Sequence, residues 1–206
     1  MKKSHLLIIA MISLSFGFIV SSIVFDSKPL ELEAATWFAD QARALPDFQL
    51  IDHNDQALIN SDLSGKWSLM FFGYTHCPDV CPTSLQTLGD MLKAIDDMDT
   101  RRRIQVIFVS VDPDRDTPAI LKTYVQYFHP DIIGASAPLE QLNYLTGAIG
   151  ISHSRNKANE NQAEYEVSHS SSIILVNPDT KFAGLFGAPH DSLAMARDLG
   201  KIIDSN

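Results

Sequence analysis

The two cysteines of the chain, Cys77 and Cys81, are separated by three residues. Four residues of helical rise cover only about 6 Å, so the two sulfur atoms can converge. An oxidised pair at this spacing forms a disulfide, whereas a reduced pair can hold a soft metal ion between two thiolates. Thiol redox chemistry and metal binding are therefore the first functions that these residue types suggest.

The segment around the cysteines joins two predicted elements. An apolar run at 67–73 predicts a buried strand, and Pro82 is suited to the first position of the helix that follows. We therefore expect Cys81 to cap this helix, where unpaired backbone N–H groups and the positive end of the helix favour the thiolate. The alternative is a disulfide that only staples the loop, although so small a loop recovers little chain entropy.

Apolar patterns along the rest of the chain predict the elements that must position the cysteines. Continuous apolar runs at 67–73, 104–111 and 172–177 predict strands buried on both faces. The polar stretch 152–166 is expected to be a surface excursion. The further predicted elements are a hairpin at 48–60, an antiparallel strand at 181–186, and helices at 82–95, 118–128, 138–149 and 191–203. This order predicts an α/β protein with a thioredoxin-like sandwich, in which helices flank a central mixed β-sheet.

The amino terminus predicts a membrane anchor. Residues 6–25 form a stretch of twenty residues without charge, and about 20 apolar residues span a bilayer as a helix. A cleaved signal peptide is the alternative, although no convincing small-x-small site follows the apolar stretch. Because Lys2 and Lys3 precede the stretch, the positive-inside rule places the globular part outside the cytoplasm.

These features divide the chain into three parts. We expect an N-terminal transmembrane helix in a membrane anchor at 1–25, a tether at 26–46 and a thioredoxin-like domain at 47–206. Arg-rich, acid-poor transit character is absent. The predicted location is therefore the bacterial inner membrane, with a single span and the soluble domain in the periplasm.

Composition and charge exclude several other classes. The chain has 206 residues, of which 45% are apolar and 20% charged, so a disordered or low-complexity protein is excluded. Lys and Arg number 16 against 25 Asp and Glu, which gives a net charge of −9. This balance argues against a nucleic-acid partner, because nucleic-acid binders neutralise phosphates with basic surfaces.

Three segments resemble the signature segments of the SCO/SenC family. They are GYTHCPDVCP at 73–82, VSVDPDRDTP at 109–118 and VSHSSSIILVNP at 167–178. Members of this family are membrane-anchored, thioredoxin-fold copper proteins that serve assembly of the CuA centre of cytochrome c oxidase. The resemblance runs from about Leu45 to the carboxyl terminus, with the three segments in the family's order.

The resemblance implies that Cys77, Cys81 and His169 together bind one copper ion, Cu(I) or Cu(II). Two thiolates and an imidazole suit copper in either valence, whereas zinc would need a fourth ligand for a closed structural site. His169 precedes the strand predicted at 172–177. In a thioredoxin-like layout the residue entering that strand faces the cysteine loop.

The remaining histidines are weaker candidates. His76 adjoins Cys77 and could tune its thiolate, but a surface loop residue explains it as well. We expect four further histidines to be solvated, because none has a partner at metal-ligand spacing: His53, His129, His153 and His190.

Two acidic residues and one serine near the signature segments need an explanation. Asp112 and Asp116 flank Pro113, where they serve either turn and cap chemistry or support of the cysteine loop behind the ligands. Many family members carry Asp immediately before the ligand histidine, whereas this chain has Ser168. A carboxylate that orients the ligand or contacts a partner is therefore missing at that position.

The resemblance favours a copper metallochaperone over an enzyme. Its expected partners are the CuA-bearing subunit of cytochrome c oxidase, a periplasmic copper donor or thiol-disulfide reductase, and the membrane. The alternative is a thiol-disulfide oxidoreductase that keeps oxidase or other periplasmic cysteines reduced, with Cys77 and Cys81 as its redox pair. A peroxidase of the peroxiredoxin type shares the fold but uses a single attacking cysteine, so the paired cysteines argue against it.

Overall fold

The computed structural model describes residues 11, 13, 15, 30–38, 41–156 and 165–205. Most of the anchor expected at 1–25 lies outside these residues, and the anchor stays a prediction. None of the helices within the described residues is both long and apolar enough to cross a membrane. The fold described below is the compact unit that begins at Leu32.

The centre of the sheet consists of three parallel strands. β5 (Trp67–Gly73) pairs with β6 (Ile104–Ser110), which in turn pairs with β7 (Ile132–Ser136). Every residue of β5 and β6 is buried, as a continuous apolar run predicts for a strand covered on both faces. The prediction for 67–73 is therefore confirmed, and the strand predicted at 104–111 ends one residue earlier. The sequence patterns did not predict β7.

Antiparallel strands extend the sheet on both sides of this centre. β10 (Ile173–Val176) pairs with β5, and β11 (Lys181–Phe186) pairs with β10. On the other side β3 (Gln49–Asp52) pairs with β7, and β4 (Ala57–Ile59) pairs with β3. The predicted mixed sheet, hairpin and antiparallel strand are thus confirmed.

Two short strands at the start of the unit complete the sheet. β1 (Ala35–Trp37) and β2 (Arg43–Ala44) both pair antiparallel with β11. The order of the sheet is β1-β11-β10-β5-β6-β7-β3-β4, with β2 also beside β11. Both strands lie within the segment expected to be a tether, 26–46. The folded domain begins before residue 47.

A buried carboxylate fixes the chain that leads into β1. Asp198 lies in α7 (Ser192–Asp204) and is fully buried. Its carboxylate accepts hydrogen bonds from the backbone N–H groups of Glu33, Ala34 and Ala35, at 2.7–2.9 Å. These bonds give the buried charge its partners and hold the entry to β1 against α7.

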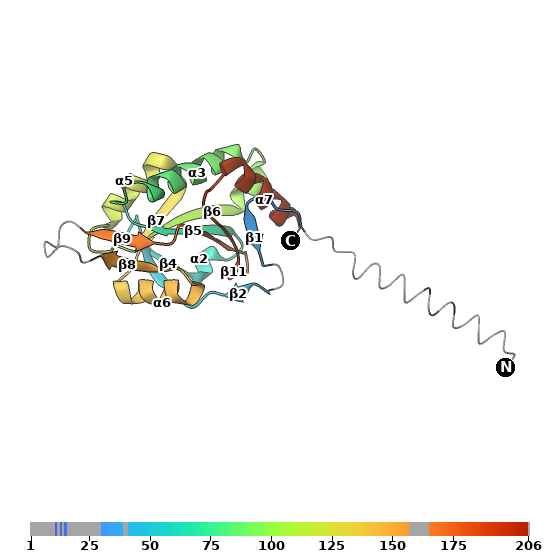
Figure 1. The fold of residues 1–206 in the computed structure, drawn as a ribbon, viewed down its shortest axis with the longest axis horizontal. Coiled ribbons are helices and arrows are strands. Elements are labelled where there is room, and N and C mark those ends of the chain that lie inside the picture. The colour runs from blue at the N-terminus through green and yellow to red at the C-terminus, as the bar shows by residue number, and fades with distance from the viewer. Residues whose placement is uncertain are drawn as a thin grey trace. The chain divides into compact units, whose positions relative to one another are not determined.

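Helices cover both faces of the sheet. α3 (Val80–Ala94), α5 (Pro118–Phe128) and α7 lie over one face, and α6 (Leu139–Ile149) and α2 (Asn60–Leu63) lie over the other (Figure 1). A short helix, α4 (Met98–Arg102), precedes β6. This arrangement is the predicted thioredoxin-like sandwich.

The apolar stripes of the predicted helices form the core between helices and sheet. On α3 the buried stripe includes Leu85, Leu88 and Leu92. On α5 the Thr117 side chain accepts the N–H of Ile120 at the helix start, and Pro118 follows it, as predicted.

A two-stranded hairpin stands apart from the main sheet. β8 (His153–Asn156) pairs antiparallel with β9 (Glu166–His169). β8 lies at one end of the polar stretch 152–166, which we expected to be a surface excursion, and β9 begins at its other end. Backbone pairing orders these ends although the side chains are polar. Figure 1 shows the hairpin beside the ends of the central strands.

Candidate metal centre

Three metal-binding side chains meet at one end of the central strands. The donor atoms of Cys77, Cys81 and His169 all lie within 4.8 Å of one another. Cys77 belongs to the loop after β5, Cys81 to the first turn of α3, and His169 to the end of β9. The Nε2 atom of His169 lies 3.2 Å from the Sγ atom of Cys81. The structure thus brings together the three residues that the family resemblance names.

The other ring nitrogen of His169 determines which tautomer the ring adopts. Its Nδ1 atom lies 3.0 Å from the backbone carbonyl oxygen of Ser170. A carbonyl oxygen only accepts hydrogen bonds, so Nδ1 carries the proton and donates it. In the neutral ring the lone pair is then on Nε2, which faces the sulfur of Cys81. This is the arrangement in which metal-binding imidazoles are commonly held.

Cys81 differs from the sequence prediction in position and in its electrostatics. α3 begins at Val80 and Asp79 precedes it as the N-cap residue, so Cys81 lies inside the helix and is fully buried. Pro82 is the third residue of the helix rather than the first. Burial raises the pKa of the Cys81 thiol far above its usual range, which opposes the thiolate that we expected the helix start to favour.

Gly73 makes the space that the Cys81 sulfur occupies. A Cβ atom at Gly73 would lie 2.4 Å from Sγ of Cys81 and 2.9 Å from a ring carbon of Phe108. Both distances are shorter than van der Waals contact. The last residue of β5 must therefore lack a side chain for the sulfur to reach its place.

Two aromatic rings pack against the His169 imidazole. The rings of Tyr74 and Phe71 make edge-on contacts with it, with centroids 5.9 and 6.1 Å away. Burial raises the pKa of Tyr74 above its usual value. These packed rings restrict the imidazole to the orientation in which Nε2 faces the cysteines.

Asp116 supports the cysteine loop through hydrogen bonds. Its buried carboxylate accepts the backbone N–H of Thr75 at 2.9 Å and the Thr75 hydroxyl at 2.6 Å. The Ser110 hydroxyl donates a third hydrogen bond at 2.5 Å. Thr75 lies two residues before Cys77. Of the two roles considered for Asp116, the structure shows the support of the loop.

Asp112 holds the hairpin that carries His169. Its fully buried carboxylate accepts hydrogen bonds from Arg115 and from the hydroxyl of Tyr165, and Arg155 of β8 lies 3.4 Å away. Burial and the bond to Asp112 raise the pKa of Tyr165 to about 12, so the phenol remains a donor. The turn after β6 therefore supports both ligand-bearing segments, through Asp116 on one side and Asp112 on the other.

Four histidines that we expected to be solvated are partly buried. Burial lowers the pKa of each of them below the usual value: His53, His129, His153 and His190. His53 accepts the N–H of Gly134 through Nδ1 at 2.8 Å. His76 remains exposed, with its Nδ1 atom 3.1 Å from the hydroxyl oxygen of Thr75.

His153 is the histidine whose place the sequence did not reveal. In the β8–β9 hairpin it lies directly opposite His169. The pairing joins residues that are far apart in a polar stretch, so neither spacing nor hydrophobic pattern indicated it. Ser168, which stands where many relatives have Asp, lies opposite Ser154 and is exposed.

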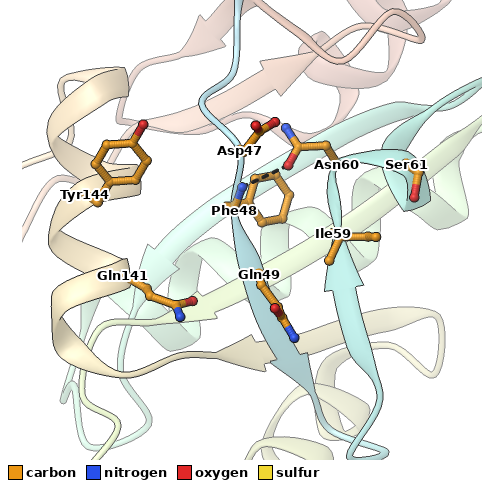
Figure 2. A pocket seen from close by; sticks show the side chains of 8 residues that line it. All are labelled: Asp47, Phe48, Gln49, Ile59, Asn60, Ser61, Gln141 and Tyr144. Atoms are coloured by element: carbon orange, nitrogen blue, oxygen red, sulfur yellow. Dashed lines mark hydrogen bonds between the residues drawn. The ribbon is translucent and has the colours of Figure 1, made fainter.

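One cavity lies apart from the cysteine cluster. It has a volume of about 520 Å³ and lies between the β3–β4 hairpin and α6 (Figure 2). The Phe48 N–H donates to the Asn60 side chain at its edge. Among its eight lining residues Asp47 is the single carboxylate, and neither cysteine nor histidine contributes. It therefore offers no second metal site of the same kind.

A thioredoxin-like sandwich with two thiols and an imidazole at one end of its sheet defines a class of thiol and metal-binding proteins. Residues 38–204 match the family model described as SCO1/SenC, and the chain belongs to this family.

Named relatives agree with this membership. A SCO2-like protein of Rickettsia felis is 31% identical over 188 residues, which cover 88% of this chain and 89% of the relative. The mitochondrial SCO2 homolog of Mus musculus is 38% identical over 141 residues, which cover 68% of this chain and 55% of the relative. The chain thus spans about half the length of the mouse relative. The structure of Bradyrhizobium japonicum ScoI with copper bound has a TM-score of 0.69 and 34% identity, covering 77% of this chain and 98% of that one.

Proposed function

We propose that this protein is a copper metallochaperone that binds one copper ion through Cys77, Cys81 and His169. It delivers the ion to the CuA centre of cytochrome c oxidase. The observation that carries the proposal is the meeting of two sulfurs and one imidazole nitrogen within 4.8 Å. Membership of the SCO1/SenC family and the copper bound in the related ScoI structure support the choice of metal.

The donor set favours copper over the commoner alternative, zinc. Thiolates are soft ligands that suit Cu(I), and imidazole binds copper in both valences. A closed zinc site uses four protein ligands, and the cluster found among the described residues has three. Three ligands are enough to hold copper and leave one side open for exchange.

The two cysteines are unequally buried, which determines the side from which a partner's ligand can reach the copper ion. Cys81 is fully buried, whereas Cys77 is half-buried in the loop. An incoming ligand from the oxidase subunit therefore reaches the metal on the Cys77 side. Copper then passes by ligand exchange, with Cys81 and His169 released after Cys77.

The proposed cellular setting follows from the amino terminus. A single span at 1–25 anchors the protein in the bacterial inner membrane, and the folded domain faces the periplasm. There it meets the CuA-bearing subunit, a periplasmic copper donor and a thiol-disulfide reductase. The reductase is needed because a Cys77–Cys81 disulfide offers no thiolate to copper.

A second candidate is a thiol-disulfide oxidoreductase, favoured by the closeness of the two free cysteines. Exchange requires an attacking thiolate. Burial raises the pKa of Cys81, so Cys77 would have to attack first. The imidazole beside Cys81 has no necessary part in this chemistry. We therefore place copper transfer first and regard the protein as a carrier rather than an enzyme.

The proposal is tested with the full-length protein, reduced and loaded with Cu(I) under anaerobic conditions. We expect one copper per chain and transfer to a purified CuA-bearing domain, followed by the absorption of the assembled CuA centre. Cys77→Ser and Cys81→Ser should each lose copper, because one thiolate and one imidazole leave the ion two-coordinate. Unchanged stoichiometry in either variant, or no transfer from the loaded protein, would contradict the proposal.

A further inference from the structure

The β8–β9 hairpin places a second imidazole beside His169. His153 of β8 is the direct cross-strand partner of His169. The Ser170 N–H donates to the carbonyl of Ser152 at 2.9 Å, so the neighbouring pair 152/170 is hydrogen-bonded. Bonded and non-bonded pairs alternate along an antiparallel ladder, which makes His153 and His169 a non-bonded pair. In such pairs the side chains approach most closely.

Burial along the hairpin shows which way the two imidazoles face. From Ser152, which precedes β8, to Arg155, the exposed Ser152 and Ser154 alternate with the half-buried His153 and Arg155. On β9 the exposed Ser168 likewise separates residues of the inner face. Directly paired residues share a face of the sheet. His153 therefore lies on the face from which His169 reaches the cysteines.

Among the described residues, no hydrogen bond fixes the ring of His153. None of the hydrogen bonds found in the described part of the chain involves its nitrogens, in contrast to His169, whose Nδ1 is held by the carbonyl of Ser170. The donor atoms of Cys77, Cys81 and His169 lie within 4.8 Å of one another, and His153 does not belong to this group. A rotation about its side-chain bonds is therefore required before it can reach a metal held by the others.

We propose that His153 is a fourth copper donor, which the site recruits when the bound ion is Cu(II). The inference rests on the proposed copper binding by Cys77, Cys81 and His169, and deepens it by assigning a ligand that depends on valence. Cu(II) prefers tetragonal sites with four donors that include nitrogen or oxygen. Cu(I) is satisfied by the two thiolates and one imidazole, so it leaves His153 unbound.

The experiment compares wild type with His153→Phe in the full-length, reduced protein. Phenylalanine retains a ring of similar size but has no donor atom. Pulsed electron paramagnetic resonance of the Cu(II) form, with ¹⁵N-labelled histidine, counts the coordinated imidazoles. We expect two in wild type and one in His153→Phe, with thiols recounted after loading to exclude disulfide formation. His129→Phe, a change at another half-buried histidine, which follows the last residue of α5, should leave two.

Affinity measurements distinguish a ligand from a residue that only supports the hairpin. We expect His153→Phe to weaken Cu(II) binding about 10–100-fold, as loss of a metal contact commonly does, while Cu(I) affinity stays within about twofold. Each tenfold selective loss of Cu(II) affinity raises the reduction potential of the bound copper by about 59 mV. A Ser154→Ala variant on the outer face should change neither affinity.

Two results would overturn the inference without touching the proposed function. One is a single coordinated imidazole in wild type that binds both copper valences. The other is an equal loss of Cu(I) and Cu(II) affinity in His153→Phe, which would show a structural role in the hairpin. Failure of wild type to bind copper in either valence would instead overturn the proposed function itself, and this inference with it.

Discussion

Gly73 and Cys81 fit together so tightly that a single carbon atom added to Gly73 would lie 2.4 Å from the sulfur of Cys81. The last residue of the strand and the second residue of the helix thus share one small space. The position of a metal-binding sulfur is set by the absence of a side chain on a neighbouring strand. This relationship gives the first prediction.

Gly73→Ala should displace the Cys81 sulfur and weaken copper binding. Neither Phe108 nor the helix start can move freely, so the strain should also lower the free energy of unfolding by about 1–3 kcal/mol. Cu(I) competition and urea unfolding measure the two effects. The matched control is Gly147→Ala in α6, where an added Cβ meets nothing within 4 Å. It should stabilise the helix by about 0.5–1 kcal/mol. Wild-type copper affinity in Gly73→Ala would contradict the prediction.

His169→Ala should separate the two candidate functions. Both thiols survive in this variant, so thiol-disulfide exchange can continue. Copper loses its only principal nitrogen ligand, and we expect its affinity to fall by at least about 10–100-fold. Cells carrying the variant should lose CuA assembly almost as fully as Cys77→Ser cells.

The readout for His169→Ala is oxidase activity at matched protein abundance. The reduction potential of the Cys77–Cys81 pair must be measured as well, because a protonated imidazole stabilises a nearby thiolate. Normal oxidase assembly with an unchanged potential would favour the reductase function over copper delivery.

Asp116→Asn should loosen the cysteine loop. One of the carboxylate oxygens that accept hydrogen bonds from Thr75 and Ser110 becomes an NH₂ group, which leaves a buried donor or acceptor unpaired. We expect a loss of about 1–3 kcal/mol in the free energy of unfolding, together with weaker copper binding. Asp99→Asn, at an exposed ion pair with Arg102, is the control and should alter neither quantity. Equal behaviour of the two variants would refute a supporting role for Asp116.

His53 should make the stability of the metal-free protein depend on pH. Burial lowers its folded-state pKa, and its Nδ1 accepts the N–H of Gly134 only when unprotonated. The unfolded chain takes up a proton below about pH 6.5, whereas the folded protein resists it down to the lowered pKa. Stability is therefore highest above pH 6.5 and falls as the pH drops through this window.

The test for His53 is urea unfolding of the reduced, metal-free protein between pH 7 and pH 5. His53→Asn places an amide oxygen near the position of Nδ1 and does not titrate, so its stability should fall less steeply. The difference in slope is at most about 1.4 kcal/mol per pH unit for one proton. Identical slopes for wild type and His53→Asn would show that His53 does not cause the pH dependence of stability.

Sequence patterns predicted best where hydrophobicity alone decides the structure. The runs that became β5 and β6 are buried on both faces, and such strands read as unbroken apolar segments. β7 was missed because its sequence, IIGAS, is short and three of its five residues are small. β1 and β2 were missed because strands of three and two residues are too short to show an alternating hydrophobic pattern. They are strands because they pair with β11.

The sequence and the family resemblance predicted which residues form the candidate site. They did not predict the position of Cys81 within its helix or the place of His153. The Cys-x-x-x-Cys spacing indicated convergence, and the family resemblance supplied His169. Cys81 was misplaced because Pro82 is allowed throughout the first helical turn, where no N–H is needed. His153 depends on strand register across a polar hairpin, which leaves no trace in local sequence.

β1 and β2 also determine what the outer side of β11 presents to other molecules. Their pairing covers the backbone donors and acceptors of β11 along both halves of the strand. An uncovered strand of this kind is a template for edge-to-edge association between chains. A fragment cut at residue 47 would therefore expose β11 and should self-associate in a concentration-dependent way, whereas one that retains residues 32–46 should stay monomeric.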